Sequence, residues 1–240
     1  MPVSADHRYI SYSRRYFGTQ EWVDGGKEFS VDVFANDLIA LIDALGLQGV
    51  HLVSWSSGVR TAIAAGIKRP DLVKSMIHFE PVEDNVFNGI QDADLKAIAS
   101  EWGSRWDPVG ESLQLGDEEA ALSHVFEIVF EMERGGYANE RELIREITRQ
   151  NARTLPVNLS RYSEDNIKLT CEYISQVTAP TLFVYGEQTH EYWQIMAKRF
   201  NDCTPDSSIA TIAGANHYAP IQKIEEVSDL ILQFVDKNRD

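Results

Sequence analysis

The sequence predicts an α/β protein built on a mostly parallel sheet, and three observations lead to this prediction. Short apolar runs alternate with longer segments in which apolar residues recur every three or four positions. Most of the apolar runs lack the polar alternation of a half-exposed sheet, which is typical of parallel strands covered by helices on both faces. One long stretch contains only the helical pattern. We therefore expect an α/β core with a helical insertion.

Five apolar runs are the expected strands, because each is short and rich in branched or aromatic residues. In chain order they are RYISYS (8–13), VHLVSWS (50–56), SMIHFEP (75–81), PTLFVYGE (180–187) and SIATIAG (208–214).

Three core helices are expected between and after these strands. The segment Ser30–Leu45 has one apolar face, with Ser30 in the position of an N-cap and Gly46 in that of a C-terminal cap. A second helix runs from Gly58 to Lys68, and a third occupies residues 223–238.

Residues 83–162 form the expected insertion, since they contain helical patterns and no strand pattern. The core domain is then residues 1–82 together with residues 163–240. An all-helical segment inserted after a strand end is typical of a cap over a ligand pocket.

The composition argues against several classes of partner. The chain has 22 basic and 37 acidic residues, and its formal net charge of −15 repels nucleic acids and anionic lipid surfaces. The N-terminus lacks a basic segment followed by an apolar one, and no apolar run approaches the roughly 18 residues of a membrane span. We expect a cytoplasmic protein in which Cys171 and Cys203 are reduced thiols, because their spacing matches neither a zinc site nor a disulfide framework.

The segment SWSSG, residues 54–58, has the pattern of a nucleophile elbow. Ser56 lies between a buried strand and a helix, and Ser54 and Gly58 are the small residues that so tight a turn requires. The backbone N–H of Ser57, at the helix N-terminus, could hold an oxyanion. The alternative is a plain strand-to-helix turn with a serine cap.

The segment IAGANHYAP supplies a candidate base. His217 follows the last expected strand and a turn that contains glycine, so it can reach a nucleophile on an earlier strand of the same sheet. The alternative for His217 is a surface loop histidine without a catalytic role.

Taken together and in this order, the segments YSRRYFG, VHLVSWSSGVRTAIAAGIKRPDLVKSMIHFEP, PTLFVYGEQT and IAGANH resemble an α/β-hydrolase with a serine nucleophile. The resemblance implies an acid that orients His217. The family's usual aspartate position is occupied by Thr189, which cannot act as an acid. Some members carry the acid after the strand that follows the nucleophile helix, so Glu80 is the first candidate, and Glu187 and Glu191 are the alternatives.

The resemblance also implies strands, and a loop of His-Gly type, before the segment at which this chain begins. We therefore expect that the sequence is a truncated form of a longer hydrolase and that Met1 is an internal start. The run Tyr9–Ser13 then either pairs directly with Val50–Val53 or leaves an unpaired sheet edge, which favours a homo-oligomer. The His-Gly loop would have supplied a second oxyanion donor.

These residues lead to one main hypothesis and one alternative. The first is a serine hydrolase that cleaves a small, fairly apolar ester, thioester or lactone through an acyl-enzyme. In it Ser56 attacks, His217 is the base, Glu80 orients His217, and no metal or organic cofactor takes part. The alternative is a non-catalytic protein that binds a small ligand under the helical cap, or an inactive truncated fragment.

Overall fold

The structure is a computed structural model that describes residues 7–161 and 165–239, and its chain divides into two compact units. The first unit comprises residues 1–12, 31–90 and 166–240, and the second comprises residues 13–30 and 91–165. The second unit thus includes a segment from before the sheet and the expected insertion from residue 91 onward, whereas residues 83–90 belong to the first unit. The expected start at Met1, and the expected end of the insertion at residue 162, lie outside the described residues.

The first unit contains a four-stranded parallel sheet in the order β1-β2-β3-β4. Strands that follow one another in the chain are therefore neighbours in the sheet, and their carboxyl ends lie at one edge. Four of the five expected strands are confirmed: β1 (Val50–Trp55), β2 (Val73–Phe79), β3 (Thr181–Gly186) and β4 (Ser207–Ile212).

The fifth expected strand, at residues 8–13, is wrong, because residues 7–14 have no regular secondary structure. Its apolar side chains are not buried, with Tyr9 56% and Ile10 38% exposed. A run of aromatic and branched residues has strand propensity, but a strand needs a neighbouring backbone to pair with. Among the described strands β1 pairs only with β2, so β1 is an edge of the sheet.

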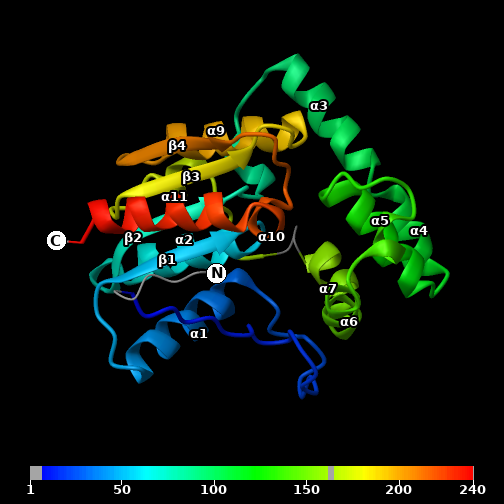
Figure 1. Ribbon diagram of the computed structural model, residues 1–240, viewed down its shortest axis with the longest axis horizontal. Helices are drawn as coiled ribbons and strands as arrows, with labels where there is room; N and C mark the ends of the chain where they lie inside the picture. Colours follow the sequence, from blue (N-terminus) through cyan, green and yellow to red (C-terminus); the bar gives the residue numbers. More distant parts are fainter. Residues whose placement is uncertain (1–6, 162–164, 240) are drawn as a thin grey trace. The chain divides into compact units, whose positions relative to one another are not determined.

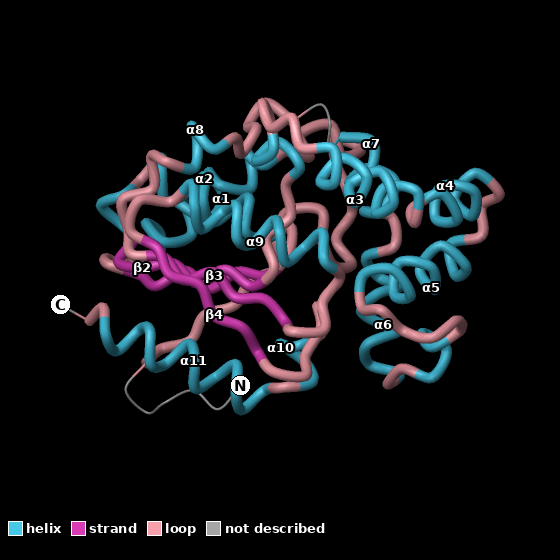
Figure 2. Tube along the Cα trace, turned by 90° about the horizontal axis from the view of Figure 1, so that it is seen from above, coloured by secondary structure: helices cyan, strands magenta, loops and turns pink. Residues whose placement is uncertain are grey.

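Helices cover both faces of the sheet (Figure 2). On one face lie α2 (Gly58–Lys68) and α9 (Glu191–Cys203), with α1 (Val31–Ala44) packed against α2. The other face is covered by α11 (Ile224–Lys237). The predicted α1 is confirmed, and the chain leaves it through Gly46 at φ +62°, a left-handed conformation in which glycine carries no steric penalty.

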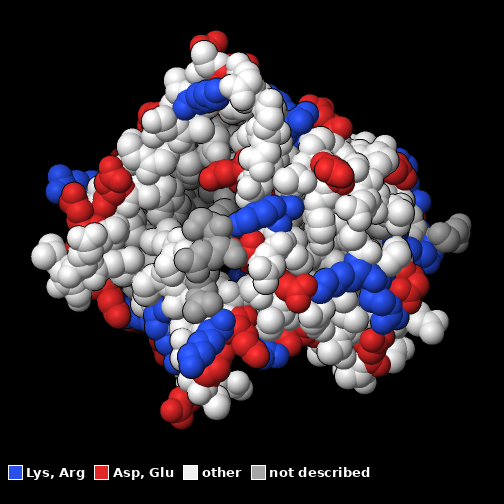
Figure 3. Space-filling model, turned by 180° about the vertical axis from the view of Figure 1, so that it is seen from behind, with Lys and Arg blue, Asp and Glu red and all other residues white. Residues whose placement is uncertain are grey.

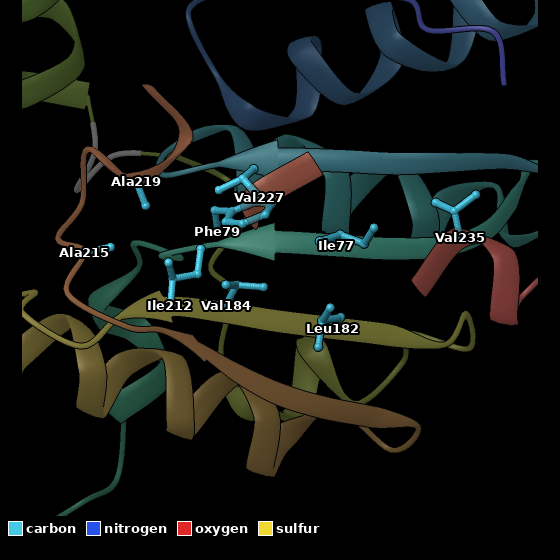
Figure 4. Close-up of a cluster of buried hydrophobic side chains, with 9 residues drawn as sticks. All are labelled: Ile77, Phe79, Leu182, Val184, Ile212, Ala215, Ala219, Val227 and Val235. Carbon is cyan, nitrogen blue, oxygen red and sulfur yellow. The ribbon is translucent and has the colours of Figure 1, made fainter. Parts of the chain in front are cut away.

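Apolar side chains fill the space between the sheet and α11 (Figure 4). The strands contribute alternate residues, and α11 contributes Val227 and Val235. Ala215 and Ala219, from the segment after β4, are 1% and 3% exposed in the same cluster. This packing attaches the loop after β4 to the core.

The second unit is helical, with no strand in its described residues. Its helices are α3 (Ala93–Ser104), α4 (Asp107–Gln114), α5 (Glu118–Val129), α6 (Glu142–Asn151) and α7 (Thr154–Arg161), shown in Figure 1. Its core contains Leu122, Phe126, Tyr137 and Ala152.

Charged side chains of both signs are interspersed on the molecular face shown in Figure 3. In the second unit, the Arg149 guanidinium makes ion pairs with the carboxylates of Glu119 and Glu142. Within residues 7–161 and 165–239 we find no helix with the length and apolarity that a membrane span requires.

The expectation of two reduced thiols is wrong, because Cys171 and Cys203 form a disulfide. Cys171 begins the short helix α8 (Cys171–Ile174), and Cys203 ends α9. These two helices pack against each other and bring the two Cα atoms to 5.0 Å, within the range that a disulfide requires. A pair of cysteines 32 positions apart carries no local signal of such packing.

Replacement of both cysteines, C171S/C203S, is expected to lower the free energy of unfolding by about 2–4 kcal/mol, because the unfolded chain loses a cross-link. Urea denaturation in the absence of reductant measures this difference. As a control, dithiothreitol should destabilise the native protein and leave the double variant unchanged. Equal stability of the two proteins without reductant would contradict the expected contribution of the disulfide.

Candidate active site

Ser56 lies directly after β1 in a strained turn. Its φ of +55° is in the left-handed region, which is uncommon for a residue with a side chain. The turn is held by two backbone hydrogen bonds, from the Ser56 N–H to the Phe79 carbonyl at 2.9 Å and from the Val59 N–H to the Ser56 carbonyl at 3.0 Å. The Ser56 side chain is therefore presented from a fixed backbone at the carboxyl edge of the sheet.

The small residues on either side of Ser56 face each other. A Cβ atom built on Gly58 would lie 3.8 Å from the Cβ of Ser54, so larger side chains at both positions would collide. Ser57 is the N-cap of α2, and its backbone N–H lies at the N-terminus of that helix. The backbone has the geometry that the SWSSG pattern predicts.

Glu80 lies directly after β2, also in a left-handed conformation, with φ +46°. Its N–H donates to the Val184 carbonyl at 2.8 Å, so the residue is attached to β3. The side chain is buried, and its Oε1 accepts hydrogen bonds from the Gly186 N–H, at 2.7 Å, and from the Thr189 hydroxyl. These donors fix the carboxylate and offset much of the cost of burying its charge.

His217 lies in the loop after β4 and is 2% exposed. The loop is attached to the core through Ala215, whose carbonyl accepts the Gln188 N–H at 2.7 Å. His217 Nδ1 lies 2.8 Å from Glu80 Oε2, and both side chains are buried. The structure therefore brings two of the predicted site residues, Glu80 and His217, into direct contact.

The environment of His217 sets its protonation state. Burial lowers the pKa of His217 from its usual 6.5, because the imidazolium is poorly solvated there, and the Glu80 carboxylate offsets part of this effect. An ionised carboxylate can only accept a hydrogen bond, so Nδ1 carries the proton that it shares with Glu80. The neutral ring then has Nε2 as its basic atom.

Two indole rings flank the imidazole of His217. The Trp193 ring, from α9, meets it edge to face with 3.9 Å between centroids. The Trp55 ring, from the residue before Ser56, lies 5.4 Å from it. Sequence reasoning did not identify Trp193, because its position in α9 is separated from His217 by β4 and a loop. The two rings restrict the orientation of the imidazole.

The other candidate acids do not contact the His217 imidazole in the described hydrogen bonds. Glu187 Oε2 accepts the Gly214 N–H at 2.8 Å and so ties the β3 and β4 loops together. Glu191 is an exposed residue in the first turn of α9. Thr189, at the family's usual acid position, instead donates its hydroxyl to Glu80. Sequence reasoning gave Thr189 no role, because its contact with Glu80 joins positions 109 apart and depends on how β2 and β3 pair.

The buried histidine of β2 has a structural environment. His78 is fully buried, its Nδ1 lies 2.7 Å from Ser54 Oγ, and burial lowers its pKa to about 3. It stays neutral in the core, where it packs against Phe183. In the described part of the chain, no group of three or more His, Cys, Asp or Glu side chains is arranged to hold a metal ion.

Comparisons with known proteins agree with this fold. The family described as alpha/beta hydrolase fold matches residues 2–224. A Synechocystis sp. protein named as a non-heme chloroperoxidase is 32% identical over 106 residues, which are 38% of this chain and 38% of that protein. The chain thus matches well under half the length of this curated relative.

Solved structures with the same fold include two hydrolases. A meta-cleavage product hydrolase from Pseudomonas fluorescens is 16% identical with a TM-score of 0.67, over 93% of this chain and 78% of that one. A thermophilic esterase from Thermogutta terrifontis is 17% identical with a TM-score of 0.64, over 95% and 79% of the two chains. At these identities the likeness concerns the fold.

Replacement of Gly186 by alanine is expected to disrupt the contact between the end of β3 and the loop that carries His217. The new Cβ would lie 2.3 Å from the Ala215 carbonyl oxygen and 2.8 Å from Thr189 Oγ1, so β3 and the His217 loop must move apart. We expect a loss of about 1–3 kcal/mol or more in the free energy of unfolding, measured by urea denaturation.

Gly110, in the interior of α4, is the matched control, because a Cβ there would meet no atom within 4 Å. G110A should leave stability unchanged or raise it by about 0.5–1 kcal/mol. The close approach of the two segments would be refuted if G186A were as stable as the native protein.

Proposed function

Because the chain belongs to the alpha/beta hydrolase fold family, we propose that it is a serine hydrolase acting on a small, fairly apolar ester, thioester or lactone through an acyl-enzyme. One observation carries the proposal: Glu80 and His217 form a buried pair, with 2.8 Å between carboxylate and imidazole, in segments that follow strands of the sheet whose β1 leads into the strained turn of Ser56. A carboxylate, an imidazole and a serine are the parts that acyl transfer requires.

The proposed reaction begins at Ser56. His217 Nε2 takes the hydroxyl proton while Ser56 Oγ bonds to the carbonyl carbon of the substrate, and the carbonyl oxygen becomes an oxyanion. The Ser57 N–H donates to that oxyanion. The carbonyl then re-forms, the bond to the alcohol or thiol breaks, and His217 returns the proton to the leaving group.

Water completes the cycle in the second half of the reaction. His217 Nε2 removes a proton from a water molecule, whose oxygen bonds to the acyl carbon. Collapse of this second oxyanion breaks the bond to Ser56 Oγ, and the proton on His217 passes to Ser56. The products are a carboxylic acid and the regenerated enzyme. A lactone gives a single hydroxy acid by the same steps.

The protonation state of His217 suits the role of base. Since burial lowers the pKa of His217 below 6.5, the ring is neutral and able to accept a proton at pH 7. When the ring becomes an imidazolium in the transition state, the Glu80 carboxylate 2.8 Å from Nδ1 stabilises the charge.

Thr189 supports Glu80 as the acid of this site. A threonine at the family's usual acid position favours the alternative of a non-catalytic, ligand-binding protein. Its hydroxyl donates to Glu80 Oε1, so Thr189 has a role that agrees with a working acid at position 80. The names of an esterase and a hydrolase among the similar structures agree with a hydrolase in general. A role of the helical insertion as a cap stays a prediction.

A fluorophosphonate probe is expected to label the native protein once, because it forms a stable bond with an activated serine. S56A should abolish the label, as detected by mass spectrometry of the intact protein. The matched control is S54A, which keeps a small residue in the turn and should retain the label. Labelling that is unchanged in S56A would exclude Ser56 as the nucleophile.

A further inference from the structure

A buried ion pair lies next to the proposed site and takes no part in the mechanism above. Arg60 Nε is 2.9 Å from Glu83 Oε2, and the two side chains are 5% and 0% exposed. Burying two charges costs several kcal/mol, and this cost is often larger than the attraction between them. Such a pair is therefore weak evidence for a stabilising role.

The position of Arg60 is also unfavourable for helix stability. Arg60 is the third residue of α2, where the helix dipole places a partial positive charge. A cation there is disfavoured, and exposed acidic side chains are the residues that usually stabilise a first turn. Residues that break a local rule of this kind are concentrated at functional sites.

The two partners follow the two proposed catalytic residues closely in the chain. Arg60 is four positions after Ser56, and Glu83 is three positions after Glu80. Pro81 stiffens the short link from Glu80 to Glu83 by fixing its own φ. The ion pair therefore connects the start of the nucleophile helix with the segment that carries the acid, on a path that does not include His217.

Glu83 is held from other directions as well. Its N–H donates to Met196 Sδ of α9 at 3.1 Å, and its Oε1 accepts the Asn85 N–H at 3.1 Å. The next residue, Asp84, accepts a hydrogen bond from the Tyr192 hydroxyl of α9 at 2.6 Å. The segment after Glu80 is thus fixed to α9 by the contacts of Met196 and Tyr192, and Arg60 is its link to α2.

We propose that Arg60 and Glu83 are positioning residues, whose ion pair sets the position of the Glu80 carboxylate relative to Ser56 and His217. The expected effect on kcat rests on the proposed hydrolase function. The expected effect on the pKa of His217 does not depend on turnover. Loss of the pair lets the segment 80–83 shift, and Glu80 then supports His217 less well.

The test uses the double variant R60M/E83Q, because removing both charges avoids leaving one of them buried and unpaired. We expect kcat for a p-nitrophenyl ester to fall about 10–100-fold with little change in KM, as for a small misplacement of catalytic groups. The control is K68M/D32N, which removes an exposed ion pair between α2 and α1 and should change neither constant.

The second readout is the pKa of His217, followed by NMR of the ¹⁵N-labelled imidazole and assigned with H217N. Glu80 is the charged group that raises the pKa of His217 against the effect of burial. A displaced Glu80 should therefore lower this pKa further, by about one pH unit, and move the acid limb of kcat to lower pH. A pair with only a structural role would change stability without moving either value.

A folded R60M/E83Q protein with native kcat and a native pKa of His217 would overturn the proposal. If the double variant does not fold, R60K is used in its place, since lysine keeps the charge and lacks the planar guanidinium. The kcat and the pKa of His217 are then measured in R60K, and native values of both would overturn the proposal. If the native protein hydrolyses no ester, the proposed function fails while the NMR titration still tests the positioning role.

Discussion

The buried carboxylate of Glu80 is the group on which the arrangement of the site depends. A carboxylate 3% exposed is tolerable only when donors surround it, and Glu80 accepts hydrogen bonds from the Gly186 N–H, the Thr189 hydroxyl and His217 Nδ1. These donors come from the end of β3, the loop after it and the loop after β4. Satisfying one charge therefore brings three segments together at the carboxyl edge of the sheet.

The backbone is strained at the two residues that follow the neighbouring strands β1 and β2. Ser56 and Glu80 both have positive φ values, of +55° and +46°. Ser56 directly follows β1, and Glu80 directly follows β2. The Ser56 N–H donates to the carbonyl of Phe79, the residue before Glu80, so the two turns are joined through the backbone. Such strain costs about 1–3 kcal/mol at each residue and persists where the surrounding packing holds it. The apolar cluster under α11 supplies part of that packing.

Most of the core could be predicted from local patterns. The continuous apolar runs and the small residues around Ser56 are signals that extend over only a few positions of the sequence. Residues 8–13 show the limit of such reasoning, because strand propensity alone does not place a segment in a sheet, and these residues have no regular secondary structure. The contact of Thr189 with Glu80 joins positions 109 apart, and the Cys171–Cys203 disulfide depends on how two helices pack. Neither could be predicted without the fold.

The most direct test of the account is the hydrolysis of a p-nitrophenyl ester by E80Q, compared with E187Q and E191Q. Glutamine keeps the shape of glutamate and removes the charge that stabilises the imidazolium of His217. We predict that kcat falls about 10⁴-fold in E80Q, as in other triads without their acid, and that the other two variants keep most of their activity. Near-native turnover by E80Q, together with loss of activity in E187Q or E191Q, would contradict the assignment of Glu80 as the acid.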